Sequence, residues 1–388
     1  MKKIVLPIIF TLVGACFTTY SFLDTFIIVK NAKAVDIDHN SGFSFTDNTT
    51  SFPTPSTSSS KNSSSSKGNT SSNPTSSSTA SSSQSSTPVN IEYFEALTAE
   101  QISALFTPEK VFREREHYSD PDIYIDITTH RDEADTTTYY VADIRLKSLG
   151  NLKTALAKDT YGMHIKERTS DICKRKKGIL AIDGDTYGEQ EGGYVVRNGV
   201  PLRDTKNLNR MRGTTSKAED LIIRGDGTFA IIDEKDTSFE EVAAQNPWQV
   251  FSFGPALVKN HEVAVNENEE VGTAMSGNRN QRCAIGIIAP KHYVFVVSDG
   301  RSSESSGLSL KAMGEILKDL HCQCAYNLDG GGSATMYLDD GTGNANGLAH
   351  LVNKPTQDLS GGYNPGQGGT SIGQREVSDI VYIGKDQE

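Results

Sequence analysis

The feature that most constrains the fold of this chain is a set of three apolar runs that each end in the dipeptide Asp-Gly. These runs begin at residues 179, 293 and 324 and end at Asp183, Asp299 and Asp329. Short apolar runs that stop at glycine are typical of buried strands. Two further Asp-Gly pairs, at Asp226 and Asp340, are interpreted as turns, because Asp-Gly is a strong hairpin signal. We therefore expect three buried strands that each carry a carboxylate at the carboxyl end.

The loop after the third run has the composition of a ligand-binding loop. It reads Asp329, Gly330, Gly331, Gly332, Ser333, Ala334 and Thr335. Because glycine lacks a Cβ, successive backbone N–H groups can turn inward and form a concavity for an anion, and the two hydroxyls add donors. Glycine content alone would favour a simple turn.

The residues before this loop favour a site over a simple turn. Leu310, Met313, Leu317 and Leu320 recur at helical spacing and predict a buried helix over residues 308–320. The loop then opens at the carboxyl end of the next strand, which is where α/β folds tend to bind ligands.

Seven segments of the chain together resemble the phosphodiester glycosidase family. They are residues 181–188, 193–199, 253–255, 282–287, 298–301, 327–336 and 375–377, in the family's order. The resemblance implies a mixed α/β fold, with packed helices on a mixed sheet and motif loops at strand ends, and a hydrolase that cleaves sugar 1-phosphodiesters. One position departs from the pattern, because Asp183 stands where the family usually has asparagine.

The chemistry of a sugar 1-phosphodiester indicates which residues matter. Its leaving group already carries negative charge, so catalysis depends on holding the phosphate and on a carboxylate that activates water or attacks the anomeric carbon. The predicted catalytic residues are Asp185, Asp329, Asp299 and Arg282. The predicted substrate-binding residues are Asp183, Gly184, Arg301, Gly330, Gly331, Gly332, Ser333, Thr335 and Arg375. Arginine suits the phosphate because its planar fork can hold two oxygens at once.

A metal and two other functions stay open as alternatives. The four acids Asp183, Asp185, Asp299 and Asp329 offer hard oxygen ligands for calcium or magnesium, but their spacing matches no calcium loop, so no residue is assigned to a metal. The same pocket on a non-catalytic module would bind wall glycans without turnover. A metal-dependent phosphodiesterase would share the carboxylates but would usually bring several histidines.

The amino-terminal part of the chain predicts export. Residues 4–22 carry no charge and follow two lysines, and the apolar segment extends to residue 29, which is long enough to cross a bilayer with a cytoplasmic amino terminus. The alternative is a secretory signal cleaved near Ala34. Residues 39–88 are dominated by Ser, Thr, Asn and Pro and cannot bury enough apolar surface to fold.

This pattern divides the chain into four parts. We expect a membrane anchor or signal segment over residues 1–34 and a disordered linker over residues 35–90. A short helical extension follows over residues 91–137, and the catalytic domain occupies residues 138–388. The catalytic domain would then lie outside the cytoplasm, with glycans of the cell envelope or an exopolysaccharide as its phosphoglycosyl substrate.

Charge and cysteine content narrow the partners further. The net charge of −11 argues against nucleic acid, which needs a basic face. Cys322 and Cys324 are too close for an easy mutual disulfide and would face opposite sides of an extended chain, so we expect buried free thiols. Trp248, the only tryptophan, lies among apolar neighbours and is expected in the core.

Overall fold

The computed structural model describes residues 33–34, 97–113, 115–208, 218–266, 279–344, 348–355 and 373–385. The predicted membrane segment (residues 4–29) and the predicted linker (residues 35–90) both lie outside these described residues. Among the described residues, no helix is both long and apolar enough to cross a bilayer.

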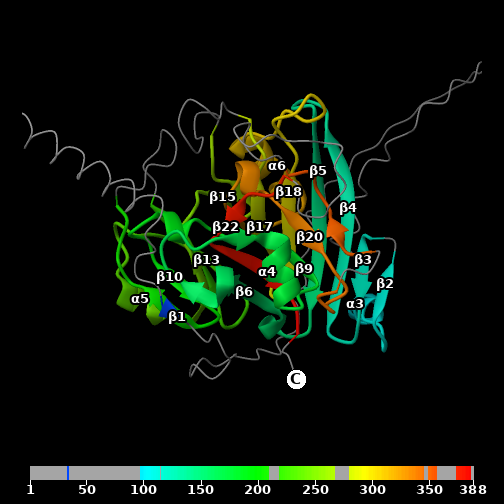
Figure 1. The fold of residues 1–388 in the computed structure, drawn as a ribbon, viewed down its shortest axis with the longest axis horizontal. Helices are drawn as coiled ribbons and strands as arrows, with labels where there is room; N and C mark the ends of the chain where they lie inside the picture. The colour runs from blue at the N-terminus through cyan, green and yellow to red at the C-terminus, as the bar shows by residue number, and fades with distance from the viewer. Residues whose placement is uncertain are drawn as a thin grey trace, which may run out of the picture. The chain divides into compact units, whose positions relative to one another are not determined.

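A nine-stranded sheet is the largest element of the fold (Figure 1). Its strands, in spatial order, are β16 (Glu262–Val263), β15 (Ala256–Lys259), β19 (Cys324–Asn327), β17 (Cys283–Ala289), β18 (His292–Ser298), β5 (Thr137–Leu146), β4 (Ile123–Asp132), β3 (His117–Ser119) and β2 (Val111–Arg113). All neighbouring strands of this sheet pair antiparallel.

Two five-stranded antiparallel sheets accompany it. The first has the order β21 (His350–Leu351), β20 (Met336–Leu338), β9 (Leu180–Asp183), β23 (Asp379–Ile383) and β6 (Leu152–Leu156). The second has the order β11 (Val200–Arg203), β10 (Val195–Arg197), β14 (Pro247–Phe251), β12 (Glu219–Arg224) and β13 (Phe229–Asp233). Two short pairs complete the sheets, β1 (Lys33–Ala34) with β7 (Thr160–Tyr161) and β8 (Glu167–Arg168) with β22 (Glu376–Val377).

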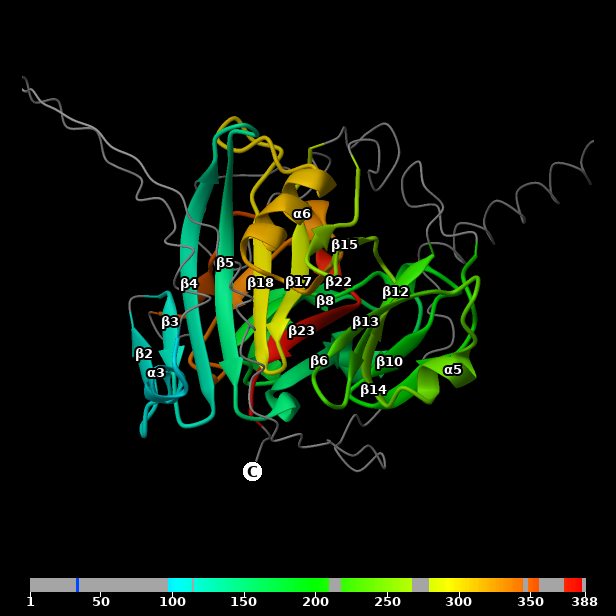
Figure 2. The ribbon, with the colours of Figure 1, turned by 180° about the vertical axis from the view of Figure 1, so that it is seen from behind.

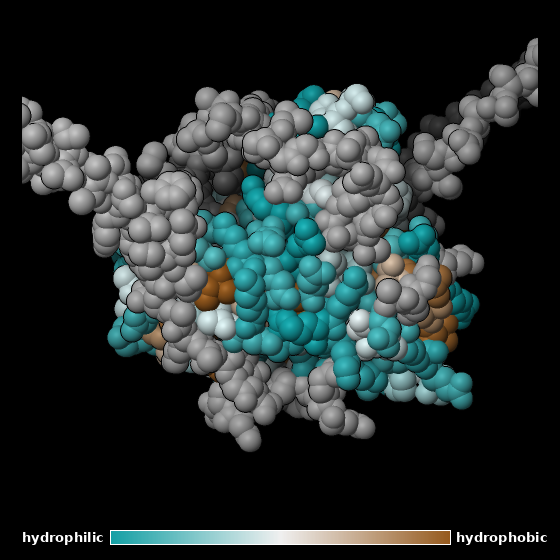
Figure 3. Space-filling view, in the orientation of Figure 1, coloured by the Kyte–Doolittle hydropathy of each residue, from teal (hydrophilic) through white to brown (hydrophobic). Residues whose placement is uncertain are grey.

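The helices are short. They are α3 (Ala99–Leu105), α4 (Thr169–Arg175), α5 (Phe239–Ala243) and α6 (Leu310–Asp319), with the 3-10 turns η1 (Leu149–Asn151), η2 (Ala157–Asp159), η3 (Tyr187–Glu189) and η4 (Gly331–Ser333). In the view of Figure 1, the surface over α4 is mainly hydrophilic (Figure 3). The expected combination of sheets and packed helices is confirmed. The expected mixed sheet is corrected, because the paired strands of the described residues all run antiparallel.

Strand β18 shows how the sequence builds two cores at once. Tyr293, Phe295 and Val297 join the large cluster that also contains residues of both five-stranded sheets, such as Ile182 and Trp248. The alternate residues of β18 join a second cluster with α6, which covers the other face of the nine-stranded sheet (Figure 2). Residues 293–297 of β18 are all apolar, and they are buried on both faces of the sheet because successive side chains point in opposite directions.

The helix expected over residues 308–320 is confirmed as α6. The Ser309 hydroxyl accepts a hydrogen bond from the Ala312 N–H and caps its first turn, and Leu310, Met313 and Leu317 are buried. At α3, Thr98 and Gln101 form a reciprocal capping box, and the helix has no buried residue. Its link to the body of the protein includes the Lys147 ammonium, which lies 4.9 Å from the centre of the Phe106 ring.

The described cysteines are free thiols and the tryptophan is buried, as expected, but Cys324 is only partly buried. The four cysteines of the described part of the chain are free, and Cys322 and Cys324 join different hydrophobic clusters. Trp248 is 1% exposed, and its indole N–H donates to the Leu152 carbonyl at 2.6 Å.

Candidate active site

The carboxyl ends of β9 and β19 meet although the two strands belong to different sheets. The Asp329 N–H donates to the Gly184 carbonyl at 3.0 Å, and the Thr335 N–H donates to Asp183 Oδ1 at 3.0 Å. Strand β20 then pairs with β9, with Met336 opposite Ile182. Two of the three Asp-Gly loops are therefore in direct contact.

A cavity of about 250 Å³ opens beside these two loops. Its lining residues are Lys166, Asp185, Thr186, Glu189, Asp329, Ser333, Arg375, Glu376, Val377 and Ser378. Four of the residues predicted from the sequence lie here together, namely Asp185, Asp329, Ser333 and Arg375. They come from segments almost 200 residues apart in the chain, so the cavity exists only in the folded protein.

The glycine loop forms a tight turn whose backbone donors are largely engaged. The Gly330 N–H donates to Asp329 Oδ1 at 2.8 Å, and the Gly331 and Ser333 N–H groups donate to the carbonyls of Gln281 and Gly330. Gly331 has φ +61°, and a Cβ there would lie 2.9 Å from Arg301 Nη2, so glycine is required. These N–H groups hold the loop in shape, and the positive charge that faces the cavity comes from side chains.

Arg375 binds the glycine loop along its length. Its backbone N–H donates to the Gly332 carbonyl at 3.0 Å, its Nε donates to Ser333 Oγ at 2.8 Å, and its Nη2 donates to the Gly330 carbonyl at 2.8 Å. The same Nη2 lies 3.6 Å from Asp329 Oδ2. The Arg375 side chain is 39% exposed and the Asp329 side chain 14%, so an accessible cation and a nearly buried acid lie side by side.

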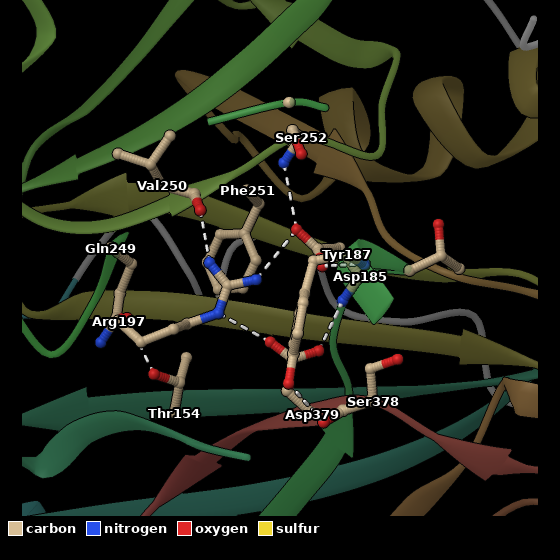
Figure 4. Close-up of polar contacts among 12 residues, drawn as sticks. Thr154, Asp185, Tyr187, Arg197, Gln249, Val250, Phe251, Ser252, Ser378 and Asp379 are labelled. Atoms are coloured by element: carbon tan, nitrogen blue, oxygen red, sulfur yellow. Dashed lines mark hydrogen bonds and ion pairs between the residues drawn. The ribbon is translucent and has the colours of Figure 1, made fainter. Parts of the chain in front are cut away.

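Asp185 belongs to a buried network of charged residues, in which both of its carboxylate oxygens accept hydrogen bonds (Figure 4). Oδ1 accepts the Tyr187 N–H at 2.8 Å, and Oδ2 accepts the Ser252 N–H at 3.1 Å. Oδ2 also forms an ion pair with Arg197 Nη2 at 2.9 Å. Its own N–H donates to Asp379 Oδ1 at 3.0 Å.

Arg197 lies between two carboxylates at the centre of this network. Its Nε donates to Asp379 Oδ2 at 2.7 Å, its Nη1 donates to the Val250 carbonyl, and its guanidinium carbon lies 4.4 Å from the centre of the Phe251 ring. Arg197 and Asp379 are both fully buried. The network joins the two five-stranded sheets, because Arg197 lies on β10 and Asp379 on β23.

Burial and the ion pair act in opposite directions on the two acids. Burial raises the pKa of Asp379 to about 7, although Arg197 favours its charged form. For Asp185, burial is opposed by Arg197 and by the Ser252 and Tyr187 N–H groups, which together hold its pKa below the usual value. Asp185 is therefore a stably ionised group whose oxygens are bound by the protein.

Asp183 lies beneath the glycine loop, outside the residues that line the cavity. It is fully buried, and its Oδ2 has no hydrogen-bond partner in the described part of the chain. Burial and the nearby charge of Asp329 raise its pKa well above the usual value. Asp183 Oδ1 accepts the Thr335 N–H, and an asparagine amide oxygen could accept the same hydrogen bond, so this contact with the glycine loop does not require the family's usual residue.

The remaining predicted residues do not line the cavity. Gly184 is packed so closely that a Cβ would lie 2.3 Å from Asp379 Oδ1. Arg282 is 3% exposed and donates from Nε to the Leu308 carbonyl at 3.0 Å. Asp299 accepts the Lys354 N–H at 2.7 Å and the Tyr140 hydroxyl at 3.2 Å, and burial raises its pKa to about 6. Arg301 packs on Gly331, as described above.

Sequence reasoning missed Arg197, Asp379 and Lys166. A charged residue inside an apolar strand pattern was the available signal for the first two, since Arg197 follows Val195 and Val196. Their pairing could not be anticipated, because 182 residues separate Arg197 from Asp379. Lys166 lines the cavity and forms a 2.7 Å ion pair with Glu189.

The acids of this region do not fit a metal site. Among the described residues, no three His, Cys, Asp or Glu side chains are placed to hold one ion. Both oxygens of Asp185 and both of Asp299 already accept hydrogen bonds from the protein. We therefore derive no step through calcium or magnesium.

Comparison with known proteins places the chain in a family. The family model described as phosphodiester glycosidase matches residues 176–383. An uncharacterised SPbeta prophage-derived protein of Bacillus subtilis (strain 168), YomE, is 28% identical over 178 residues, which cover 45% of this chain and 26% of that protein. This chain thus matches about a quarter of the length of that relative.

Two solved structures are similar to the chain. The zebrafish N-acetylglucosamine-1-phosphodiester α-N-acetylglucosaminidase catalytic domain, auto-inhibited by its pro-peptide, is 20% identical with a TM-score of 0.48, over 68% of this chain and 83% of that one. A hypothetical protein from Synechocystis is 15% identical with a TM-score of 0.46, over 68% and 62%. On the family match to residues 176–383, the chain belongs to the phosphodiester glycosidase family.

Proposed function

We propose that the chain hydrolyses GlcNAc-type sugar 1-phosphodiesters at the anomeric C–O bond. The products are the free sugar and a phosphomonoester. The observation that carries this proposal is the pairing of Asp329 with Arg375 in one cavity, where an acid and a cation lie 3.6 Å apart. The first can react at the anomeric carbon while the second holds the charged leaving group.

The geometry distinguishes the roles of the two candidate acids. Asp185 has both oxygens bound by Arg197 and by backbone N–H groups, so it positions the wall of the cavity. Asp329 uses Oδ1 to accept the Gly330 N–H, and its Oδ2 faces Arg375 at a longer distance. Asp329 is therefore the acid that we assign to the reaction, either as the base that activates water or as the nucleophile.

The bond changes follow from this assignment. Water, directly or after attack by Asp329, supplies the oxygen that bonds to the anomeric carbon, and its proton passes to the carboxylate. The C–O bond to phosphate breaks, and its electron pair stays on the phosphate oxygen. The guanidinium of Arg375 stabilises the negative charge that develops on the phosphate oxygen. Lys166 is a second cation that lines the same cavity.

An isotope experiment tests the proposal directly. The full chain is incubated with a synthetic alkyl ester of GlcNAc 1-phosphate in ¹⁸O-labelled water, and the products are analysed by mass spectrometry. We expect the label in the free sugar. Label in the phosphate would show cleavage of the P–O bond by a phosphodiesterase, and binding of the ester without products would show a non-catalytic glycan module. Parallel assays with and without a chelator test whether a divalent cation takes part.

The non-catalytic module is favoured by one observation, the replacement of asparagine by Asp183. The geometry argues against that alternative, because Asp183 Oδ1 accepts the Thr335 N–H, a contact that an asparagine amide oxygen could also make. The phosphodiesterase has less support, since no histidine is among the residues that line the cavity.

We also propose that the enzyme acts outside the cytoplasm on glycans of the cell envelope or on an exopolysaccharide. The support is the sequence pattern of residues 4–29, which fits a membrane anchor or a signal segment cleaved near Ala34. Protease treatment of intact cells tests this location. Digestion of the catalytic domain without lysis is expected, and full protection until lysis would contradict it.

A further inference from the structure

A second, larger cavity lies next to the candidate active site. Its volume is about 470 Å³, within the range typical of small-molecule sites, roughly 300–1,000 Å³. Its lining residues are Tyr161, Gly162, Met163, Tyr187, Glu191, Leu202, Arg203, Asp204 and Thr205. The segment from Asp185 to Glu191 lines both cavities, since Asp185, Thr186 and Glu189 line the first. The proposed function does not use this second cavity.

An ordered aromatic surface forms one side of the second cavity. The Tyr161 ring stacks on the Tyr187 ring, with centroids 5.1 Å apart and planes 19° apart. Tyr187 is 2% exposed and Tyr161 is half-buried. A ring fixed in this way presents a flat apolar surface, against which the C–H groups of a sugar ring can pack with little loss of side-chain entropy.

The polar groups of the cavity suit hydroxyls better than phosphate. Asp204 and Glu191 are exposed carboxylates, and ionised carboxylates only accept hydrogen bonds. Arg203 uses its fork inside the protein, donating from Nε to the Gly193 carbonyl at 2.6 Å and from Nη1 to the Tyr187 carbonyl at 3.0 Å. Arg203 Nη2 has no hydrogen-bond partner in the described part of the chain. The lining therefore offers two acceptors and one donor, which suits the hydroxyls of a neutral sugar.

We propose that this second cavity is a glycan subsite that binds an uncharged sugar unit next to the phosphodiester. This deepens the proposed function and rests on it for the identity of the neighbouring reaction site. The arrangement of the two cavities supports it, because the segment from Asp185 to Glu191 lines both of them. The substrate class would be an oligosaccharide or polysaccharide that carries the 1-phosphodiester.

Tyr187 connects the two cavities physically. Its backbone N–H donates to Asp185 Oδ1, and its hydroxyl donates to the carbonyl of Ser378, a residue that lines the first cavity, at 3.2 Å. Its other ring contact is the Arg197 guanidinium, at 5.7 Å. A sugar packed on the tyrosine pair would therefore be held at a fixed distance from the reacting phosphodiester.

The test measures binding without turnover. The full chain is titrated with chitotriose and, separately, with maltotriose, and the dissociation constants are measured by saturation-transfer NMR. We expect at least one trisaccharide to bind at about 1 mM, and Tyr161→Ala to weaken that binding by about tenfold. The substitution removes only a side chain, and the backbone pairing of β7 with β1 does not depend on it.

A matched control and a second variant make the result specific. Tyr139→Ala removes another half-buried tyrosine, which lies on strand β5 and lines neither cavity. Its ring stacks on the His130 ring with centroids 5.1 Å apart. This variant should leave the affinity unchanged. Asp204→Ala removes an exposed carboxylate and should weaken binding by about threefold to tenfold.

Two outcomes would overturn the subsite. One is the absence of binding for both trisaccharides at about 10 mM, and the other is equal affinity for the wild type, Tyr161→Ala and Asp204→Ala. Neither outcome depends on hydrolysis. A chain that binds the trisaccharide through Tyr161 but releases no sugar from the phosphodiester would refute the proposed activity and leave the subsite in place.

Discussion

At the scale of single residues, the site depends on one acid whose surroundings differ from those of its neighbours. Asp183 and Asp185 are fully enclosed, whereas the Asp329 side chain keeps 14% of its surface exposed next to Arg375. Of these three aspartates, only Asp329 therefore combines access to the cavity with an adjacent exposed cation.

We expect Asp329→Asn to lower kcat/KM for a GlcNAc 1-phosphodiester by about 10²-fold to 10⁴-fold, the usual contribution of a proton-transfer group. The amide keeps the shape and an oxygen that can accept the Gly330 N–H, so folding should be preserved. Asp226→Asn is the matched control, because Asp226 occupies an Asp-Gly hairpin turn and accepts the Thr228 N–H. More than a tenth of wild-type activity in the Asp329 variant would contradict the assignment.

Arg375→Lys should lower kcat/KM by about tenfold, and Arg375→Ala by about a hundredfold. Lysine keeps the positive charge but loses the hydrogen bonds of the guanidinium to Ser333 and Gly330, and alanine removes both the charge and these bonds. Steady-state kinetics on the same ester measures the effect. Full activity in the alanine variant would show that another group holds the phosphate.

The raised pKa of Asp299 leads to a prediction of how the free energy of unfolding depends on pH. Burial raises its pKa from 3.8 to about 6, so the folded protein holds this proton more tightly than the unfolded chain. The resulting stabilisation is complete below pH 4 and is lost as the pH rises from about 4 to about 6, with an upper limit of about 3 kcal/mol. Urea unfolding across this range should show a smaller loss of unfolding free energy with rising pH for Asp299→Asn. Identical slopes for variant and wild type would show that Asp299 ionises normally.

At the scale of elements, the shape of the glycine loop depends on backbone conformation. Gly331 has positive φ and contacts Arg301, so Gly331→Ala should cost about 1–2 kcal/mol of unfolding free energy and disturb the adjacent Asp329. Gly227→Ala is matched in strain, because Gly227 has φ +83° in a hairpin whose residues line neither cavity. We expect both variants to lose stability and only the Gly331 variant to lose kcat/KM. Equal activities would mean that the turn serves stability alone.

The elements that sequence could predict are those set by local pattern. The continuous apolar runs predicted β9, β18 and β19, and the spacing of Leu310, Met313 and Leu317 predicted α6. Both follow because buried residues recur in the sequence with the period of the strand or helix that carries them. The contact between the loops after β9 and β19 followed from the resemblance. The placement of Asp299 away from the cavity, the bound oxygens of Asp185 and the Arg197–Asp379 pair depend on which strands become neighbours, and local pattern does not specify that.

At the scale of the whole catalytic domain, the last strand is structurally central. Strand β23 pairs with both β9 and β6 and supplies Asp379 to the buried network. Removing residues 376–388 should therefore prevent folding, because β9 and β6 would lose their shared neighbour and the buried Arg197 would lose one of its two carboxylate partners. Circular dichroism and solubility measure the effect, with removal of residues 386–388 as the control. A folded, active protein without β23 would contradict this account.

The position of β23 also has a consequence for when activity can begin. A ribosome synthesises residues 376–383 after almost everything else in the domain, yet the cavity is lined by Glu376, Val377 and Ser378. A nascent chain thus has no complete site until its final strand inserts. A chain made only up to residue 375 therefore lacks three residues of the cavity wall and the Asp379 partner of Arg197.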